Sequence, residues 1–213
     1  MKEHRMDWDR ASRTGTAEAV LCDSKTSAQI AAILFAAETA GQRLLLTRLS
    51  KGKARKLARA TLDYERASQT AILGGPPPDP MRNGIGIVAA GTSDLAIARE
   101  AQRTLAFHGV EAPITADVGV AGIWRLMDQV ETLRQHRVLI AIAGMEGALF
   151  SVLAGLVRAP VIAVPAPVGH GVAEGGRLAL DAALGGCAPG VVVVNIGNGF
   201  GAACAALRML GDR

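Results

Sequence analysis

The spacing of apolar positions predicts an α/β fold for the C-terminal part of the chain. After residue 82, short runs that are apolar at every position alternate with longer segments of helical periodicity. Such runs are typical of parallel strands that are covered by helices on both faces. We therefore predict an open, doubly wound parallel sheet in a three-layer sandwich, with a strand order of the flavodoxin type. The predicted strands are Gly86–Ala90, Ile114–Ala116, Val138–Ala143, Val161–Val164 and Val191–Asn195.

The first 73 residues follow a different pattern and predict a small α/β module. An apolar segment of helical spacing follows two residues that can each serve as its cap, Ser24 and Thr26. A short apolar run and a strongly basic segment come after it. The predicted elements are a helix over Thr26–Thr39, a strand over Arg43–Thr47 and a helix over Ser50–Ala60.

The two patterns are separated by the segment Gly-Gly-Pro-Pro-Pro-Asp-Pro at residues 74–80. Proline has a fixed φ angle and no backbone donor, so this segment cannot continue a helix or a central strand. We place the domain boundary here. The N-terminal module then covers residues 1–73, a proline-rich linker covers 74–82, and the larger α/β domain covers 83–213.

Composition favours a cytoplasmic protein with reduced thiols. Half of the residues are hydrophobic but only 3% are aromatic, so the core must consist mainly of small aliphatic side chains. Glu146 and Arg158 interrupt the longest apolar stretch, and the charged first ten residues contain no signal-peptide core, so we expect no membrane association. The three cysteines are odd in number and lack metal-type spacing, which disfavours a disulfide framework or a zinc site.

The net charge of +4 comes entirely from the N-terminal part of the chain. Residues 1–80 contain 13 Lys and Arg against 9 Asp and Glu, whereas residues 81–213 contain 10 of each. Seven basic residues and no acidic residue fall between Gly41 and Ala60. No aromatic residue interleaves these charges, so a solvated helix face is favoured over a nucleic-acid surface. We expect no nucleic-acid partner.

The first predicted strand of the larger domain runs into a segment suited to phosphate binding. Gly91-Thr92-Ser93-Asp94 directly precedes a predicted helix over Leu95–Phe107. Backbone amides and hydroxyls at a helix N-terminus form a cradle for phosphate. The same residues also fit an ordinary helix cap through Ser93 or Asp94. Both interpretations stay open on the sequence alone.

Glycine-rich segments follow the other strands as well. The carboxyl ends of strands in a doubly wound sheet meet at one crevice, where such folds bind ligands. Glu146 also fits an acid at a helix N-terminus, and His170 also fits an ordinary surface loop. The residues that we expect to line the crevice are Ser93, Asp94, Asp117, Glu146, His170 and Asn198.

Two of the cysteines have distinct contexts. Cys187 precedes the last predicted strand, so we expect it at the amino end of that strand, away from the crevice. A neighbouring subunit or a long loop would have to bring it back. From the residues alone, a buried small hydrophobe is the default interpretation of Cys187. Cys204 lies in the apolar final helix and is expected in the core.

A resemblance is carried by the segments Ala89–Leu95, Asp117–Ile123, Ala143–Leu149 and Asn198–Ala202 and by N-terminal residues between Asp9 and Ile30. These residues resemble the LarB family. This family comprises pyridinium-3,5-biscarboxylic acid mononucleotide synthases, which act in nickel-pincer nucleotide cofactor biosynthesis. It lies within the superfamily of aminoimidazole-ribonucleotide carboxylase, the PurE-like superfamily.

The resemblance implies carboxylation of the pyridinium ring of nicotinic acid adenine dinucleotide by CO₂ or bicarbonate. Hydrolysis of the phosphoanhydride would release AMP. It also implies a homo-octamer, with Mg²⁺ as a cofactor to be tested. Cys187 would be the nucleophile and Glu146 the proton acceptor. Thr92, Ser93 and Asp94 would hold the ribose phosphate, with further substrate contacts from Gly91, Asp117, Gly144, Met145, His170 and Asn198.

Two alternatives remain beside this function. One is a purine-type aminoimidazole-ribonucleotide carboxylase or mutase, although the active-site histidine of those enzymes is replaced here by Ala148. The other is a nonenzymatic nucleotide-binding homologue, which the presence of Cys187 disfavours. The chain departs from the LarB pattern at Trp124, where a histidine commonly precedes Arg125, at Gly197 in place of an acid, and at His170 in place of a tyrosine.

Overall fold

The computed structural model describes residues 4–57, 61–75 and 81–211. The chain divides into two compact units. The first comprises Met1–Pro80 with Phe107–Gly109, and the second comprises Met81–Ala106 with Val110–Arg213. Five residues of the linker predicted at 74–82, residues 76–80, lie outside the described residues. No helix within the described ranges is long and apolar enough to cross a membrane.

The first unit contains a four-stranded sheet with helix α2 packed on it. The strand order is β1-β2-β4-β3, in which β1 and β2 are parallel and the other two pairs are antiparallel. Helix α2 begins after Thr26, whose hydroxyl accepts from the Gln29 amide while the Gln29 side chain accepts from the Thr26 amide. Thr26, and not Ser24, is therefore the cap. The elements are α1 Arg10–Thr14, β1 Ala19–Leu21, α2 Ser27–Thr39, β2 Leu44–Thr47, α3 Lys51–Lys56, β3 Leu62–Glu65 and β4 Thr70–Leu73.

The basic helix α3 has a structural role in this unit. It ends at Lys56, earlier than predicted, and residues 58–60 of the predicted helix lie outside the described residues. Its Ala54 packs into the core, while the ammonium group of Lys53 donates to the carbonyl oxygens of Cys22 and Asp23 at 2.8 and 2.6 Å. At least one positive charge of the basic segment thus stabilises the loop that follows β1.

The second unit is the predicted doubly wound fold. Its five parallel strands lie in the order β6-β5-β7-β8-β9, which confirms the flavodoxin-type order. The prediction for the third strand matches its observed bounds, and the last strand is two residues shorter than predicted. The strands are β5 Ile85–Ala89, β6 Ile114–Thr115, β7 Val138–Ala143, β8 Val161–Pro165 and β9 Val191–Val193.

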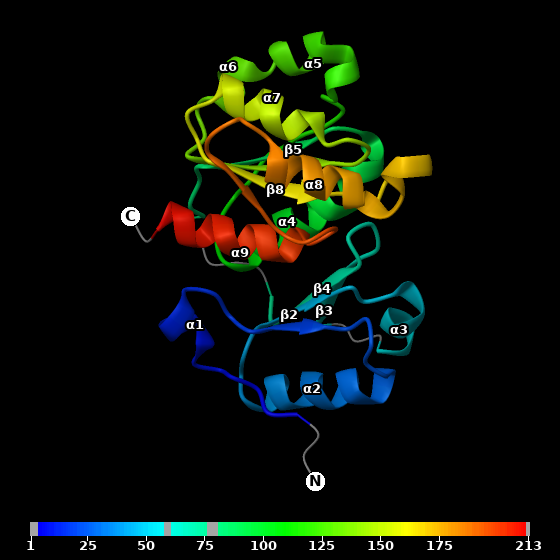
Figure 1. Cartoon of the computed structure of the whole chain (residues 1–213). Coiled ribbons are helices and arrows are strands. Elements are labelled where there is room, and N and C mark those ends of the chain that lie inside the picture. The colour runs from blue at the N-terminus through cyan, green and yellow to red at the C-terminus, as the bar shows by residue number, and fades with distance from the viewer. Residues whose placement is uncertain (1–3, 58–60, 76–80, 212–213) are drawn as a thin grey trace. The chain divides into compact units, whose positions relative to one another are not determined.

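Helices cover both faces of this sheet (Figure 1). Helices α4 (Leu95–Phe107) and α9 (Gly199–Leu210) pack on one face. The other face carries α5, α6, α7 and α8. Their bounds are Ile123–Met127, Val130–Leu133, Ala148–Leu156 and Arg177–Gly185, and short 3-10 turns occur at Thr92–Asp94, Val120–Gly122 and Gly171–Gly176.

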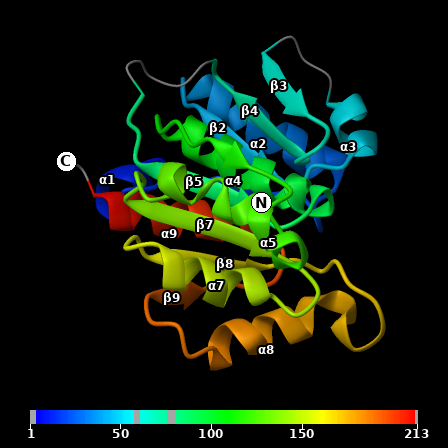
Figure 2. The same ribbon diagram turned by 90° about the horizontal axis from the view of Figure 1, so that it is seen from above.

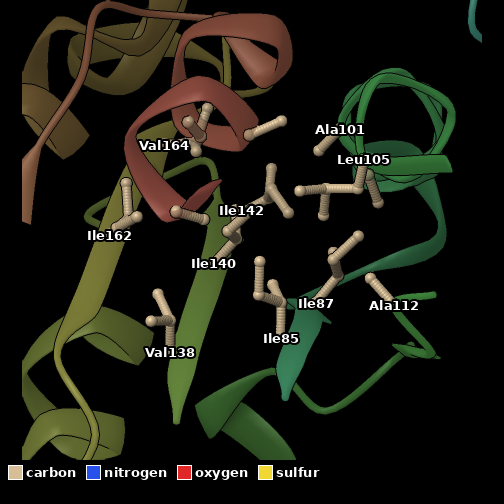
Figure 3. Packing of buried hydrophobic residues seen from close by; sticks show 14 of the residues in the cluster. Ile85, Ile87, Ala101, Leu105, Ala112, Val138, Ile140, Ile142, Ile162 and Val164 are labelled. Carbon is tan, nitrogen blue, oxygen red and sulfur yellow. The ribbon is translucent and has the colours of Figure 1, made fainter. Parts of the chain in front are cut away.

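Alternate residues of the central strands point to opposite layers. On β7, Ile140 and Ile142 join the core beneath α4 and α9, whereas Leu139 and Ala141 join the core beneath α7 and α8. Figure 3 shows the first of these layers, in which Leu105 of α4 packs near the aliphatic side chains of β5 and β7. Both faces of the sheet are buried, which explains why its strands are apolar at every position.

The cysteines differ from the expectations. Cys187 is exposed, so its default interpretation as a buried small hydrophobe is wrong. It lies in a loop of glycine, alanine and proline that provides no apolar layer to cover it. Cys204 is only half-buried, because its position on α9 lies at the margin of the helix face that packs on the sheet. Cys22 is buried, and burial raises the pKa of its thiol to about 12.

Candidate functional site

The loop after β5 holds a buried carboxylate with an unused oxygen. Asp94 is 3% exposed, and its Oδ2 accepts a hydrogen bond of 2.9 Å from the Gly91 amide. Its Oδ1 is buried and has no hydrogen-bond partner. Burial raises the pKa of Asp94, and the Gly91 hydrogen bond opposes that shift. A buried polar atom without a partner is uncommon and marks a place where a ligand group can bind.

The other two residues of this loop differ from Asp94. Thr92 and Ser93 are more accessible to solvent, within a short 3-10 turn that leads directly into α4. Their hydroxyls and the neighbouring amides therefore lie at the solvent side of a helix start, which is the arrangement that anion binding requires. The N-cap position is Gly91, so the prediction of Ser93 or Asp94 as the cap is wrong, and Asp94 instead accepts from the Gly91 amide three residues back. This bond leaves the Thr92 and Ser93 hydroxyls available to a ligand.

Backbone hydrogen bonds join the loops at the carboxyl ends of the strands. The Ala90 amide donates to Ile142 at 2.9 Å and the Val118 amide donates to Ala89 at 3.3 Å. On the other side, the Met145 amide donates to Val168 at 2.9 Å. The Gly197 amide, which donates to Pro165 at 2.8 Å, adds the loop of Asn198. We call these joined loops the rim, and they carry the predicted crevice residues Ser93, Asp94, Asp117, Glu146, His170 and Asn198.

Two glycines allow the loops of this rim to approach closely. A methyl group on Gly144 would lie 2.1 Å from the carbonyl oxygen of Val168, and one on Gly119 would lie 2.9 Å from that of Ala90. Real side chains do not tolerate such distances, so both positions require glycine. The glycine at 144 therefore serves backbone packing, beside any substrate contact.

The backbone on both sides of Glu146 is left-handed. Met145 has a φ angle of 52° and is followed by an exposed carboxylate at Glu146 and by Gly147 at a φ of 67°. A left-handed conformation at a non-glycine residue costs free energy and persists only where neighbouring contacts enforce it. Here the Met145 amide bond to Val168 supplies that contact, and Glu146 is presented to solvent at the rim.

His170 and Asn198 have local structural roles. The side-chain oxygen of Asn198 accepts from the Gly201 amide at 2.8 Å and caps helix α9. His170 is exposed, and its carbonyl oxygen accepts from the Ala173 amide at 3.1 Å. Both residues lie in rim loops, and their predicted contacts with substrate stay predictions.

Cys187 lies apart from this rim. It occupies the loop between α8 and β9, at the amino end of β9, whereas the other predicted residues follow the carboxyl ends of strands. Figure 2 shows α8 and β9 together at one side of the sheet. The neighbouring Gly186 packs beside Ser151 of α7, where a methyl group on the glycine would lie 2.9 Å from the Ser151 hydroxyl oxygen.

A cleft of about 430 Å³ opens at the carboxyl end of β6. It contains Trp124, which is 66% exposed, and an ion pair in which Nη1 of Arg125 lies 2.7 Å from Oδ2 of Asp117. The sequence marked Trp124 only as a departure from a family pattern and did not indicate that Arg125 pairs with Asp117. A larger cavity of about 830 Å³ lies in the first unit, and none of the predicted site residues lines it.

Glu100 was also missed. Its side chain is 6% exposed on α4, and its Oε2 accepts from the Phe200 amide at 3.4 Å at the start of α9. A carboxylate at that position complements the positive end of the helix dipole. Within the described parts of the chain, no three His, Cys, Asp or Glu side chains form a group that could hold a metal ion.

Comparison with known families decides the assignment of the second unit. Residues 84–213 match the model of AIR carboxylase, which covers more than half of the chain. The chain belongs to the AIR carboxylase family. Residues 1–74 match the LarB/PurE-like N-terminal domain, so this AIR carboxylase family member is LarB-like. The resemblance drawn from the sequence is confirmed at this level.

Similar proteins include one curated relative and one solved structure. MJ0165, an uncharacterized protein of Methanocaldococcus jannaschii, is 48% identical over 120 residues, which is 55% of this chain and 46% of the relative. The chain thus spans about half of the length of that relative. A crystal structure of a serine-to-aspartate variant of Treponema denticola PurE2 matches with a TM-score of 0.50 and 22% identity, covering 61% of this chain and 80% of that one. This similarity supports the fold alone.

Proposed function

We propose that the protein carboxylates the pyridinium ring of nicotinic acid adenine dinucleotide and hydrolyses its phosphoanhydride to release AMP, as a step of nickel-pincer cofactor biosynthesis. The observation that carries this proposal is the pairing of a LarB-type N-terminal domain with an AIR carboxylase domain in one chain. The family supports a carboxylase-type reaction, and the LarB-type domain favours this substrate over a purine precursor.

The chemistry gives a role to the exposed thiol. A pyridinium ring is electrophilic and does not itself attack CO₂. Addition of the Cys187 thiolate to C4 forms a C–S bond and moves an electron pair onto the ring nitrogen, which makes C5 an enamine-like nucleophile. C5 then forms the new C–C bond to CO₂. Transfer of the C5 proton to Glu146 and expulsion of the thiolate restore the aromatic ring.

The rim loops supply substrate binding in this proposal. Thr92 and Ser93 would hold the ribose phosphate, with the free oxygen of Asp94 accepting from a ribose hydroxyl or from a bound water. Mg²⁺ would associate mainly with the phosphates of the substrate, as is usual for that ion. Whether CO₂ or bicarbonate is consumed does not change these roles.

Cys187 precedes β9 and Glu146 follows β7, so our proposal assigns the two groups of one site to different chains. We expect a homo-octamer in which a neighbouring subunit supplies the thiol. The exposed side chains of Leu184 on α8 and Val192 on β9, at 66% and 40%, flank the Cys187 loop and suit a subunit contact. Light scattering after size exclusion should give the mass of an assembly, and a monomer with full activity would contradict the proposal.

The function is tested by incubating the protein with the dinucleotide, bicarbonate and Mg²⁺. Mass spectrometry should detect the biscarboxylated mononucleotide and AMP in equal amounts. A parallel incubation with aminoimidazole ribonucleotide tests the purine-type alternative, and substrate binding without either product would indicate a nonenzymatic homologue.

A further inference from the structure

We propose that the cleft at the end of β6 binds the zwitterionic pyridinium carboxylate ring of the substrate by stacking it on Trp124. This inference rests on the proposed function and names the side chains that receive the ring. The cleft is lined by Asp117, Trp124, Arg125, Asp128 and Gln129 beside the backbone of β6 and the residues that follow it.

The indole of Trp124 is exposed within the cleft. Trp124 is 66% exposed on α5, although it lies in a cleft and tryptophan has the largest apolar surface of any side chain. An indole face attracts both flat rings and cations, and a pyridinium ring is both at once. Trp124 therefore offers a stacking surface that matches the substrate ring more closely than it matches a sugar or a phosphate.

Charged side chains of both signs line the cleft. The cleft combines one guanidinium, from Arg125, with two carboxylates, from Asp117 and Asp128. A nicotinate ring carries a positive charge on its nitrogen and a negative carboxylate substituent. The guanidinium can pair with the substituent while the two acids offset the ring charge. Two carboxylates would repel a phosphate, so the cleft does not suit a phosphate alone.

The guanidinium of Arg125 is held in place by its neighbours. Its Nη1 binds Asp117, and its Nε is buried without a hydrogen-bond partner. A methyl group on Gly122 would lie 2.8 Å from that Nε, so the absence of a side chain at Gly122 lets the guanidinium pack against the loop backbone. Asp117 itself has a left-handed φ of 60°. The loop is thus strained and packed so as to fix Arg125 before a ligand arrives.

The position of the cleft agrees with the proposed binding of the ribose phosphate. The cleft adjoins the loop after β5, because the Val118 amide donates to Ala89 and Gly119 packs on the carbonyl of Ala90. That loop continues into Thr92, Ser93 and Asp94, the proposed ribose-phosphate cradle. A ring bound over Trp124 would therefore lie next to its own ribose phosphate.

The test uses an optical signature of the stack. An electron-rich indole in face-to-face contact with a pyridinium gives a charge-transfer absorbance that neither partner shows alone. Titrating the full-length protein with nicotinic acid mononucleotide should produce this band. Trp124→Ala should abolish it and weaken binding by about 10- to 100-fold in calorimetry, the range expected for loss of one stacked base. Trp124→Phe should keep most of the affinity.

Two variants provide matched controls. Trp8→Phe changes the other tryptophan, in the first unit, and should leave both the band and the affinity unchanged. Met127→Ala removes another exposed apolar side chain on the same short helix, outside the residues that line the cleft, and should also have no effect.

Related ligands distinguish the contribution of the ring charge from that of the carboxylate substituent. Nicotinamide mononucleotide keeps the cationic ring but lacks the carboxylate, so it should bind about tenfold more weakly, and Arg125→Met should remove this difference. AMP carries a neutral ring and should show no dependence on Trp124. Tighter binding of AMP through Trp124, or an unchanged nicotinate affinity in Trp124→Ala, would overturn the inference. The inference would also be overturned if Trp124→Ala changed the oligomeric mass of the protein but kept its affinity for nicotinic acid mononucleotide.

Binding and turnover measured together distinguish a failure of the ring site from a failure of the proposed function. A charge-transfer band without any carboxylated product would leave the ring site standing and refute the proposed function. Normal turnover of the dinucleotide by Trp124→Ala, with an unchanged KM, would refute the ring site and leave the proposed function intact.

Discussion

The loops that carry Asp94 and Cys187 differ in almost every physical respect. Asp94 is buried, hydrogen-bonded to Gly91 and fixed between a strand and a helix. Cys187 is exposed in a glycine- and proline-containing loop at the other end of the sheet. The first loop places its carboxylate in the interior of the unit, whereas the second leaves its thiol exposed in the single chain. Variants at these loops should therefore separate folding from chemistry.

Cys187→Ala should produce the largest effect on activity. Removal of the thiol should lower carboxylation by at least about a thousandfold, since covalent activation of the ring is then lost. The melting temperature should change little, because substitutions at exposed positions usually alter the free energy of unfolding by less than about 0.5 kcal/mol. Cys204→Ala, on α9, serves as the control with normal activity. Product formation at the wild-type rate by Cys187→Ala would eliminate the thiolate mechanism.

Gly144→Ala should produce the largest effect on folding among the rim positions. Its methyl group would collide with the Val168 carbonyl, so we expect a loss of about 2 kcal/mol or more in the free energy of unfolding, of the size seen for overpacking. A methyl group on Gly155, in α7, would meet no neighbouring side chain or loop within 4 Å, and Gly155→Ala should instead stabilise by about 0.5–1 kcal/mol. Urea unfolding of both variants measures the contrast. Equal effects would refute the close approach of the two loops.

Asp94 should add a smaller, pH-dependent term to stability. Burial raises its pKa, so above the ordinary value of 3.8 the folded state holds this proton more tightly than the unfolded state. The favourable contribution is then complete below pH 3.8 and is lost as the pH rises through the raised pKa. Urea unfolding from about pH 3.5 to 7 should show wild-type stability falling relative to Asp94→Asn. A constant difference between the two proteins would contradict the desolvation of this carboxyl.

Ser93 provides the matched comparison for that loop. Because it is exposed, Ser93→Ala should leave stability nearly unchanged while weakening the binding of the dinucleotide. Asp94→Ala, in contrast, should weaken binding and also lower stability by about 1–3 kcal/mol, since the Gly91 amide loses its acceptor. The burial of Asp94 makes these two substitutions unequal, which the sequence alone did not indicate.

The second unit was predictable because its signals are long and redundant. Apolar periodicity located β7 and the helix Leu95–Phe107 at their observed bounds. The first unit was harder: β3 and β4 have four residues each, and β1 has three, so their side-chain patterns are too short to identify. Antiparallel pairing between β2, β3 and β4 is a tertiary property that local periodicity does not carry.

The candidate site was predictable only in its position. Topology placed the rim loops together, because all parallel strands end at the same edge. Burial was not accessible in the same way: Glu100 occupies a helix whose sequence gives it no distinction from solvent-facing acids, and it is buried only because α9 begins beside it. The pairing of Arg125 with Asp117 likewise depends on the turn through Gly122 rather than on a motif.

The strand β9 has a consequence for how the protein behaves when its subunits are separated. Within the described residues β9 pairs only with β8, so its outer edge presents unpaired backbone groups beside four consecutive valines, residues 191–194. An uncharged, valine-rich edge strand is a template for adding further strands. Assembly that covers this edge would thus protect the protein from aggregation as well as complete a site. Substitutions that separate the subunits should therefore produce turbidity rather than a stable monomer.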